Sequence, residues 1–470
     1  MNRELMSDFG PVLSDGTRVA DLMDPERFEV SMRLLSDPEL YRFELDRLFA
    51  KTWNVVAHES EIPNAGDYVS RYIGEDPVIV TRDRHGVVHV LLNVCQHRGM
   101  TVCRAEAGNA SQFRCPYHGW VYDAGDGSFI GAPVAQEQPW GDIVPRSELG
   151  LPRARVEQFA GFVFANLDPD GLSLDEFLGD YKWYLQLYYD RTPAGMEVVG
   201  PPQRFTVRGN WKLGAEQFVG GDGYHVLTLH RSLYQIGVLG DLDRGDDLAG
   251  AYGCDVSFTQ GHSIRANDNR RMMESMGMGA LIDESLSPIE QLKRLPPPGM
   301  TPDMVDSMVG HLDDGQLRQL AYYTPSVGGC FPNVATFQFP LLSLEGPLSA
   351  VHGIHIFAPK GVDEMEWWHF TLVERDAPDE LKELIGRTTG QMVGSTAMIE
   401  QDDGYCWPEM TRAARGSVAR QQTIKYQART GVNKPDDWHG GGVVSYGFTK
   451  DDGQWNWWRS YFACMTGRYR

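Results

Sequence analysis

The pattern of apolar and polar residues predicts a helix near the start of the chain, followed by a β-rich block. Residues 37–50 predict a helix, because Asp37 can cap it, Pro38 suits its first position and apolar residues recur on one side. From about residue 53 to 165 short strands alternate with turns, and Arg82-Asp83-Arg84-His85-Gly86 separates two apolar runs as in a hairpin. We therefore expect one small β domain here.

The remainder of the chain mixes helical and strand periodicities. Apolar residues recur at helical spacing from Leu174 to Tyr189, and Asp376-Ala377-Pro378-Asp379 opens a second helix towards Met392. A looser stretch at 260–310 holds seven of the 18 methionines. Three strands of one antiparallel sheet are expected at Val334 to Leu342, His352 to Phe357 and Met365 to Glu374.

These elements predict an α+β fold, in which a β-rich domain is inserted into a larger domain whose antiparallel sheet is covered by helices. The expected parts are 1–52, a helical piece of the larger domain, 53–165, the inserted domain, and 166–470, the main part of the larger domain. A chain of 470 residues is long enough for this arrangement.

Composition narrows the classes of function. A formal charge of −21 and a pI near 5.0 argue against a nucleic-acid partner. No apolar run approaches the ~20 residues of a membrane span, and the segment from Met1 to Asp8 lacks the apolar core of a secretion signal. The seven cysteines are dispersed and odd in number, which fits the cytoplasm better than a disulfide framework.

Two short loops of the β-rich block carry candidate metal ligands. Cys95-Gln96-His97-Arg98-Gly99 and, seventeen residues after His97, Cys115-Pro116-Tyr117-His118-Gly119-Trp120 each supply one thiolate and one imidazole. Two cysteines on one iron and two histidines on the other are the ligand set of a Rieske [2Fe–2S] cluster, which transfers one electron at a time. A structural zinc site is the alternative, although zinc modules usually pair Cys-x-x-Cys with His-x-x-x-His.

A second pair of candidate ligands lies in the larger domain. His225 and His230 are five residues apart, about 140° around a regular helix, so they converge only where the helix is widened, bent or ended. Two structural histidines are the alternative. Two histidines and a carboxylate form the facial triad of non-haem Fe(II), and the chain offers Glu400-Gln401-Asp402-Asp403-Gly404, which also fits a solvated acidic helix end.

With these residues in view, the chain resembles the α subunits of Rieske-type aromatic ring-hydroxylating oxygenases over essentially its whole length. The cluster motif and its order before the Asp/His motif are jointly very specific. The β-rich block would be the Rieske domain and residues 166–470 the main part of the catalytic domain. The matching segments are the two cysteine loops, Asn210-Trp211-Lys212, Asp222-Gly223-Tyr224-His225 with His230, Phe331-Pro332-Asn333 and Glu400-Gln401-Asp402-Asp403.

The resemblance implies a role for each matched ligand. Cys95 and Cys115 would bind one iron of the cluster, and His97 and His118 would bind the other. The mononuclear iron would be bound by His225, His230 and Asp403.

Two aspartates carry further expectations. Asp402 is the fallback for the third iron ligand. Asp222 matches the family's bridging carboxylate, which lies between the catalytic iron of one subunit and the cluster of its neighbour; a helix N-cap is its alternative role. The chain departs from the family at two positions: one extra residue at Gly220-Gly221, and Gln217 where Asn is frequent.

The implied activity is insertion of both atoms of O₂ into an aromatic ring, giving a cis-dihydrodiol. Electrons would come from NAD(P)H through a reductase and usually a ferredoxin. No run of Arg or Lys marks a carboxylate pocket, which favours a neutral polycyclic hydrocarbon over an aromatic acid such as phthalate. The bridging role of Asp222 implies a ring of at least three α subunits, with or without a small β subunit.

Two further features allow a functional or an ordinary interpretation. Arg98, Arg104 and Arg114 could steer an acidic electron donor to the cluster loops, or could be solvated surface residues. The methionines of residues 272–308 could form a mobile entrance over an apolar pocket, or could fill core. Both interpretations stay open at this point.

Three other functions also stay open. A Rieske monooxygenase or demethylase would carry the same motifs. A non-enzymatic electron-transfer protein would keep only the cluster. A zinc-stabilised binding protein would be colourless.

Overall fold

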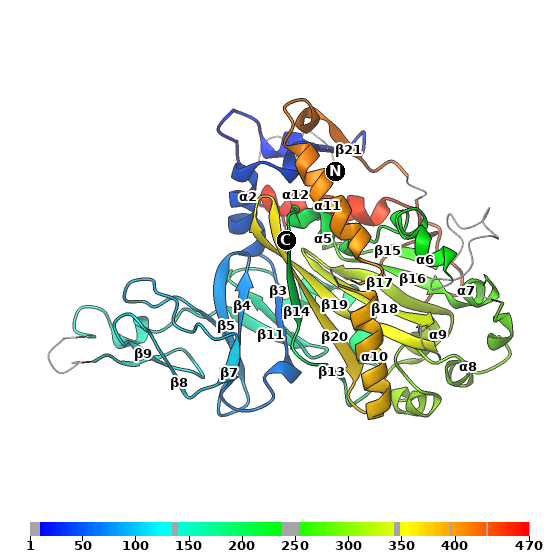
Figure 1. Ribbon diagram of the computed structural model, residues 1–470, viewed down its shortest axis with the longest axis horizontal. Coiled ribbons are helices and arrows are strands. Elements are labelled where there is room, and N and C mark those ends of the chain that lie inside the picture. Colours follow the sequence, from blue (N-terminus) through cyan, green and yellow to red (C-terminus); the bar gives the residue numbers. More distant parts are fainter. Residues whose placement is uncertain are drawn as a thin grey trace. The chain divides into compact units, whose positions relative to one another are not determined.

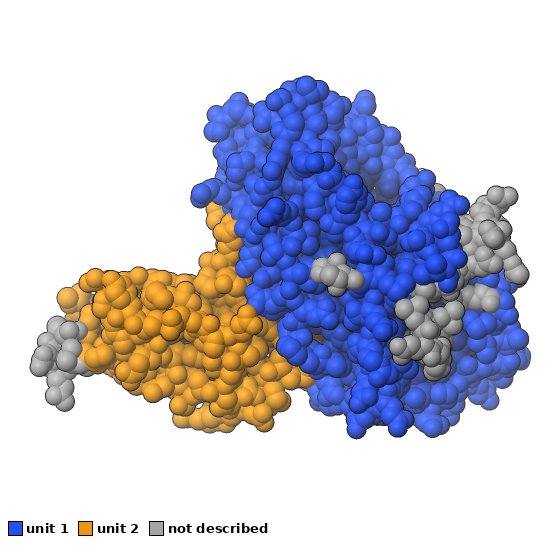
Figure 2. Space-filling model, in the orientation of Figure 1, with its two compact units in different colours: residues 1–44, 175–470 blue, residues 45–174 orange. Residues whose placement is uncertain are grey.

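The chain leaves one structural unit after residue 44 and returns to it at residue 175 (Figures 1 and 2). Residues 45–174 form a second unit, which contains the whole of the β-rich block expected at 53–165. The computed structural model describes residues 10–133, 140–236, 253–275, 277–342, 348–394, 397–428 and 431–469.

Short antiparallel strands build the unit of residues 45–174. They form three sheets, with the orders β6-β5-β4-β7, β10-β9-β8 and β11-β12-β3. The predicted hairpin is confirmed, because β5 and β6 pair from Val78 opposite Leu92 to Arg82 opposite Val88. The strands are β3 Asn54–His58, β4 Asp67–Ile73, β5 Asp76–Arg82, β6 Val88–Leu92, β7 Ala107–Asn109, β8 Gln112–Arg114, β9 Val121–Asp123, β10 Phe129–Gly131, β11 Arg155–Phe159 and β12 Phe162–Asn166.

A nine-stranded antiparallel sheet organises the other unit. Its order is β13-β20-β19-β18-β17-β16-β15-β22, and β14 also pairs with β20. The three strands predicted from the sequence are β18, β19 and β20, which are neighbours in this sheet. The strands are β13 Met196–Val198, β14 Gln203–Val207, β15 Gly253–Ser257, β16 Ser263–Asp268, β17 Tyr323–Cys330, β18 Val334–Leu342, β19 Leu348–Gly361, β20 Glu364–Glu374 and β22 Val443–Tyr446, and a small sheet joins β1 Met23–Asp24, β2 Glu29–Ser31 and β21 Thr423–Lys425.

Helices cover the large sheet. Helix α5 packs against β17, β18 and β19, and α10 packs against β19 and β20 (Figure 1). At Gly329 of β17 a Cβ would lie 2.8 Å from Val219 Cγ2, so this glycine lets α5 approach the sheet closely. The α-helices are α2 Pro38–Glu44, α3 Leu174–Leu178, α4 Tyr181–Tyr189, α5 Trp211–Val219, α6 Arg231–Gln235, α7 Asn269–Ser275, α8 Pro288–Arg294, α9 Asp314–Tyr322, α10 Asp379–Met392, α11 Gln401–Ala414 and α12 Asp452–Met465.

The predicted helices are present with altered limits. The helix expected at 37–50 is α2, whose first turn is capped by Asp37 Oδ1 accepting from Glu39 N at 2.9 Å, followed by a π-helical turn at Leu45–Phe49. The helix expected from Leu174 to Tyr189 is divided into α3 and α4, because Gly179 has a left-handed φ of +48°.

The predicted α+β class, with a β-rich insertion and a helix-covered antiparallel sheet, is confirmed. The stretch 260–310 is more regular than its composition suggested, since it contains β16, α7 and α8. Among the described residues, no helix combines the length and the apolar character that a bilayer crossing requires.

Candidate active site with two metal centres

The two cysteine loops have the same backbone hydrogen bonds. Cys95 N donates to Met100 O at 2.8 Å, and Cys95 O accepts from Gly99 N at 2.8 Å. In the second loop Cys115 N donates to Trp120 O at 2.7 Å, and Cys115 O accepts from Gly119 N at 3.0 Å. Gly99 and Gly119 have φ of +75° and +71°, values that favour glycine. This matched turn explains why each loop has glycine four residues after its cysteine.

The four candidate cluster ligands come together at these loops. The rings of His97 and His118 have centroids 4.5 Å apart, and Cys95 and Cys115 are both 2% exposed. The Nδ1 atom of His97 is buried and has no hydrogen-bond partner. Buried thiols beside an unsatisfied imidazole nitrogen fit a soft metal centre, which would satisfy both kinds of donor.

Aromatic residues whose role the sequence did not reveal surround this centre. Trp120 stacks on His97 with ring centroids 5.0 Å apart, and Trp140 lies edge-on to His97 at 5.6 Å. The hydroxyl of Tyr122 is 3.1 Å from Cys95 Sγ. These contacts shield one side of the cluster site from water and supply it with a hydrogen-bond donor.

In the other unit, His225 and His230 converge because no continuous helix joins them. A 3₁₀ turn spans His225–Leu227, and α6 starts at Arg231. The two imidazole rings have centroids 5.2 Å apart. The interruption supplies the irregular geometry that their five-residue spacing requires.

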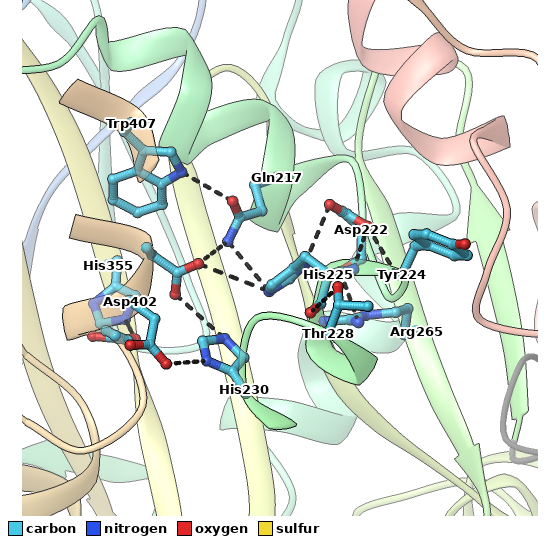
Figure 3. Close-up of polar contacts among 12 residues, drawn as sticks. Gln217, Asp222, Tyr224, His225, Thr228, His230, Arg265, His355, Asp402 and Trp407 are labelled. Carbon is cyan, nitrogen blue, oxygen red and sulfur yellow. Dashed lines mark hydrogen bonds and ion pairs between the residues drawn. The ribbon is translucent and has the colours of Figure 1, made fainter. Parts of the chain in front are cut away.

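Asp403 joins these two histidines. One ligand atom from each of the three residues lies within 4.8 Å of the other two (Figure 3). Asp403 Oδ1 is 3.9 Å from His225 Nε2, and Oδ2 is 3.5 Å from His230 Nε2. Asp403 is 1% exposed, and its Oδ2 has no hydrogen-bond partner. Burial raises the pKa of Asp403 to about 7, so this carboxylate calls for a nearby cation.

Two outer aspartates face the far nitrogens of the same rings (Figure 3). Asp222 Oδ2 lies 3.2 Å from His225 Nδ1, and Asp402 Oδ2 lies 3.5 Å from His230 Nδ1. Each imidazole therefore presents Nε2 to Asp403, with a carboxylate behind it. Such carboxylates orient metal-binding histidines and raise their basicity. Asp222 also accepts from Tyr224 N at 2.8 Å, as in an Asx turn, but it caps no regular helix.

Gln217 connects the three-residue group to the protein interior. Its Nε2 donates to Asp403 Oδ1 at 2.8 Å and lies 3.3 Å from His225 Nε2. Its Oε1 accepts from Trp407 Nε1 at 2.9 Å (Figure 3). The glutamine found in place of the more frequent asparagine thus reaches the site directly.

The extra residue at Gly220-Gly221 is absorbed where α5 ends. Gly220 N donates to Glu216 O at 2.9 Å, and Gly221 adopts a left-handed φ of +73°. The turn closes with Asp222 N donating to Gln217 O at 2.8 Å. The insertion therefore leaves Asp222 and Gln217 in place beside His225.

An apolar cluster adjoins the histidines and was only partly predictable. Leu233 lies one turn after His230 and packs with side chains from β18, β19 and α10. The buried members are Leu233, Phe337, Val351, Met392 and Val393.

The methionines of the 260–310 stretch line a different cavity. Met272, Met273, Met278 and Met300 border a space of about 130 Å³, together with Gln338, Ala350 and prolines 296–298. Gln338 and Ala350 alternate along their strands with Phe337 and Val351 of the apolar cluster, so the two groups face opposite sides of β18 and β19. The predicted entrance stays a prediction, and Met276 lies outside the described residues.

Comparison with known proteins agrees with this geometry. Residues 52–151 match the Rieske [2Fe-2S] domain, and residues 174–438 match the ring hydroxylating alpha subunit (catalytic domain). The chain belongs to the ring-hydroxylating oxygenase α subunits. It is 34% identical to biphenyl 2,3-dioxygenase subunit alpha of Rhodococcus jostii over 441 residues, which are 92% of this chain and 88% of that protein.

Other α subunits are similarly related. N,N-dimethyl phenylurea N-demethylase subunit alpha of Sphingobium sp. is 33% identical, over 96% of this chain and 95% of that protein. Naphthalene 1,2-dioxygenase from Rhodococcus sp., solved with bound indole, superposes with a TM-score of 0.81 at 33% identity and covers 94% of this chain and 95% of its own.

As a member of this family, the α subunit is an oxidoreductase that uses O₂, a Rieske [2Fe–2S] cluster and a mononuclear iron. It works with aromatic substrates and with a ferredoxin or reductase as electron donor. The zinc-stabilised binding protein and the cluster-only electron carrier are thereby excluded, since both the Rieske domain and the catalytic domain match.

Proposed function

We propose that this α subunit dihydroxylates a neutral aromatic hydrocarbon and releases a cis-dihydrodiol. The observation that carries the proposal is the placement of His225, His230 and Asp403, with ligand atoms within 4.8 Å of one another, next to an apolar cluster. These three residues would hold the mononuclear iron. Cys95, His97, Cys115 and His118 would hold the Rieske cluster.

The cluster would supply electrons, and the mononuclear iron would supply O₂ activation. The protein's own residues bind and orient. Asp222 and Asp402 hold the two imidazoles by their Nδ1 atoms, and Gln217 fixes Asp403 Oδ1. The apolar cluster excludes water from the side of the site that begins at Leu233.

The substrate class follows from that apolar wall. Its buried members carry no charge, so they offer no partner to the carboxylate of an aromatic acid such as phthalate. The names of relatives include biphenyl, benzene and naphthalene dioxygenases, which supports a neutral one- to three-ring hydrocarbon. Removal of a substituent is the second candidate, because one relative is an N-demethylase.

Partners and assembly are also proposed. Arg98, Arg104 and Arg114 are all exposed around the cluster loops, where they would attract an acidic ferredoxin. Asp222 would bridge to the cluster of a neighbouring α subunit, which requires a closed ring of three such subunits. A small β subunit and a cytoplasmic location stay predictions; the seven cysteines, all free, agree with the latter.

Product analysis tests the proposal. The purified holoenzyme, with a ferredoxin and reductase, is given ¹⁸O₂ and naphthalene, biphenyl, phenanthrene, phthalate or an N,N-dimethyl phenylurea. We expect two labelled oxygen atoms in a diol of a neutral hydrocarbon. One labelled atom, or formaldehyde release, would establish the demethylase instead. An iron count of two per chain would refute the mononuclear site.

Asp222→Asn tests the bridge. We expect both metal centres to be retained and turnover to fall by about 10- to 100-fold, because the link between the centres is altered. In the variant, the pre-reduced cluster should stay reduced when substrate and O₂ are added. Glu409→Gln, at an exposed carboxylate of α11, is the control and should behave as wild type.

A further inference from the structure

Three buried side chains form a hydrogen-bonded chain behind the candidate iron site. Glu400 Oε1 and His355 Nε2 are 2.5 Å apart, and His355 Nδ1 and His369 Nδ1 are 3.2 Å apart (Figure 3). His369 Nε2 reaches Thr371 Oγ1 at 3.2 Å. Glu400, His355 and His369 are 2%, 0% and 1% exposed. Nothing in the oxygenase chemistry described above uses them.

The chain has one consistent arrangement of protons. Burial raises the pKa of Glu400 well above its usual value, and burial lowers the pKa of His355 to about 3 and that of His369 well below its usual range. All three groups are therefore neutral. The Glu400 carboxyl donates to His355 Nε2, His355 Nδ1 donates to His369 Nδ1, and His369 Nε2 donates to Thr371 Oγ1.

Glu400 is tied down on both of its oxygens. Its Oε2 accepts from Gly394 N at 2.6 Å, and its other oxygen binds His355. Although Glu400 directly precedes α11, its side chain does not cap that helix. Its hydrogen bonds go instead to β19 and to the segment before the helix.

Asp403 is carried by the turn that Glu400 begins. Glu400 O accepts from Gly404 N at 3.0 Å, so the first turn of α11 runs from Glu400 past Asp403. Adjacent residues on a helix point about 100° apart. A small rotation of this turn would therefore exchange the carboxylate that faces the two imidazoles. The bond from Glu400 to His355 opposes that rotation.

The ring of His355 is itself held by aromatic packing. Its centroid lies 4.6 Å from that of Phe337 and 5.0 Å from that of Trp367. Both neighbours are buried residues of the central sheet. His355 is thus a fixed point to which the start of α11 is attached.

We propose that His355 and Glu400 are positioning residues, which hold the carboxylate of Asp403 towards His225 and His230. This inference rests on the proposed iron site. The His369–Thr371 end of the chain fixes the His355 tautomer.

Iron affinity tests the inference without relying on activity. Protein that retains its cluster but lacks the mononuclear iron is titrated with Fe(II), and the ferrous site is then examined by electron paramagnetic resonance of its nitric oxide complex. We expect Glu400→Ala to weaken Fe(II) binding about 10- to 100-fold and to broaden the nitrosyl signal, with the cluster absorbance unchanged.

The conservative variant separates positioning from simple stability. Glu400→Gln should bind Fe(II) within about threefold of wild type, because its amide donates to His355 and accepts from Gly394 as the neutral acid does. His352→Gln, which removes another buried histidine of β19 from the opposite face, should leave the affinity and the signal unchanged. If Glu400→Ala does not fold, Glu400→Asp replaces it, since its shorter side chain cannot reach His355.

The outcomes distinguish the two claims. If wild type takes up no iron beyond the cluster, the proposed function fails. If wild type binds Fe(II) and Glu400→Ala binds it equally well, only the positioning role fails. Equal losses in Glu400→Ala and Glu400→Gln, or in His352→Gln, would also overturn it.

Discussion

The carboxylate of Asp402 lies 3.5 Å from Nδ1 of His230, whereas its neighbour Asp403 lies 3.5 Å from Nε2 of the same ring. Two consecutive aspartates thus face the two nitrogens of one imidazole. The first is partly exposed and the second is buried. This difference separates a residue that orients a ligand from a residue that is one.

Substitution of each aspartate should give distinct results. Asp403→Ala is expected to abolish mononuclear iron binding, because it removes a buried ligand, while sulfide content and cluster absorbance stay at wild-type levels. Asp402→Asn should keep the iron but weaken its binding about 10- to 100-fold. Iron and acid-labile sulfide counts, followed by Fe(II) titration, measure both. Iron loss in Asp402→Asn with retention in Asp403→Ala would reverse the assignment.

Tyr122→Phe should lower the reduction potential of the cluster. The hydroxyl lies 3.1 Å from Cys95 Sγ, and a donor to a ligand thiolate stabilises the more electron-rich, reduced state. A net loss of about 1 kcal/mol corresponds to a shift on the order of 40 mV for one electron. Spectroelectrochemistry measures the potential.

Tyr68→Phe is the matched control for that change. Tyr68 packs against the same apolar cluster as the cysteine loops, but its contacts are with Phe113 and Cys103 and not with a candidate ligand. Its potential should equal that of wild type. A shift of similar size in both variants would show a packing effect and not a hydrogen bond.

The glycine pair at the end of α5 should tolerate alanine unequally. A Cβ on Gly220 would lie 2.3 Å from Glu216 O and 2.8 Å from Gln454 Cα, whereas a Cβ on Gly221 would be no closer than 3.5 Å to any neighbour. Gly220→Ala should therefore destabilise by about 2–3 kcal/mol, and Gly221→Ala by about 1 kcal/mol, from its left-handed φ alone. Denaturant unfolding compares the two, and equal losses would contradict the close approach.

His262 should make the protein less stable as the pH falls. Its Nε2 donates to Phe177 O at 2.7 Å and its Nδ1 accepts from Phe331 N at 2.9 Å, which requires the neutral ring. Burial lowers its pKa to about 4 from a usual value of 6.5. Between those values the unfolded chain binds the extra proton, so the free energy of unfolding decreases as pH falls from 6.5 towards 4.

Replacing His262 removes this contribution to the pH dependence. Between pH 7 and pH 5, wild type should lose about 2 kcal/mol more unfolding free energy than His262→Gln. Urea unfolding of both proteins at the two pH values measures the difference. Parallel losses would mean that another group is responsible.

Local patterns in the sequence were sufficient for the cysteine loops and for β18, β19 and β20. Each of those features depends on residues within one loop or one strand, and β5 and β6 are joined by a short turn. The division of the helix expected from Leu174 to Tyr189 depends on one backbone angle at Gly179, which periodicity does not detect. Tertiary context decides such angles.

The roles of Asp402 and Asp403 were harder to predict. Neighbouring residues of a helix differ in direction by about 100°, so the choice depends on how α11 is rotated over the sheet. That rotation follows from the contact of Glu400 with His355, which the sequence does not reveal. One clue was available, because His352, His355 and His369 interrupt otherwise apolar strands and so call for buried partners.

The partners of the His230–Asp402 contact are 172 residues apart, whereas Cys95 and Tyr122 are 27 residues apart. Closing the longer loop costs more chain entropy and requires the intervening strands to be in place. During synthesis on the ribosome, the first metal pocket is complete long before the second one. Maturation is therefore expected to be ordered, with iron–sulfur insertion open to the nascent polypeptide and mononuclear iron accepted only after release.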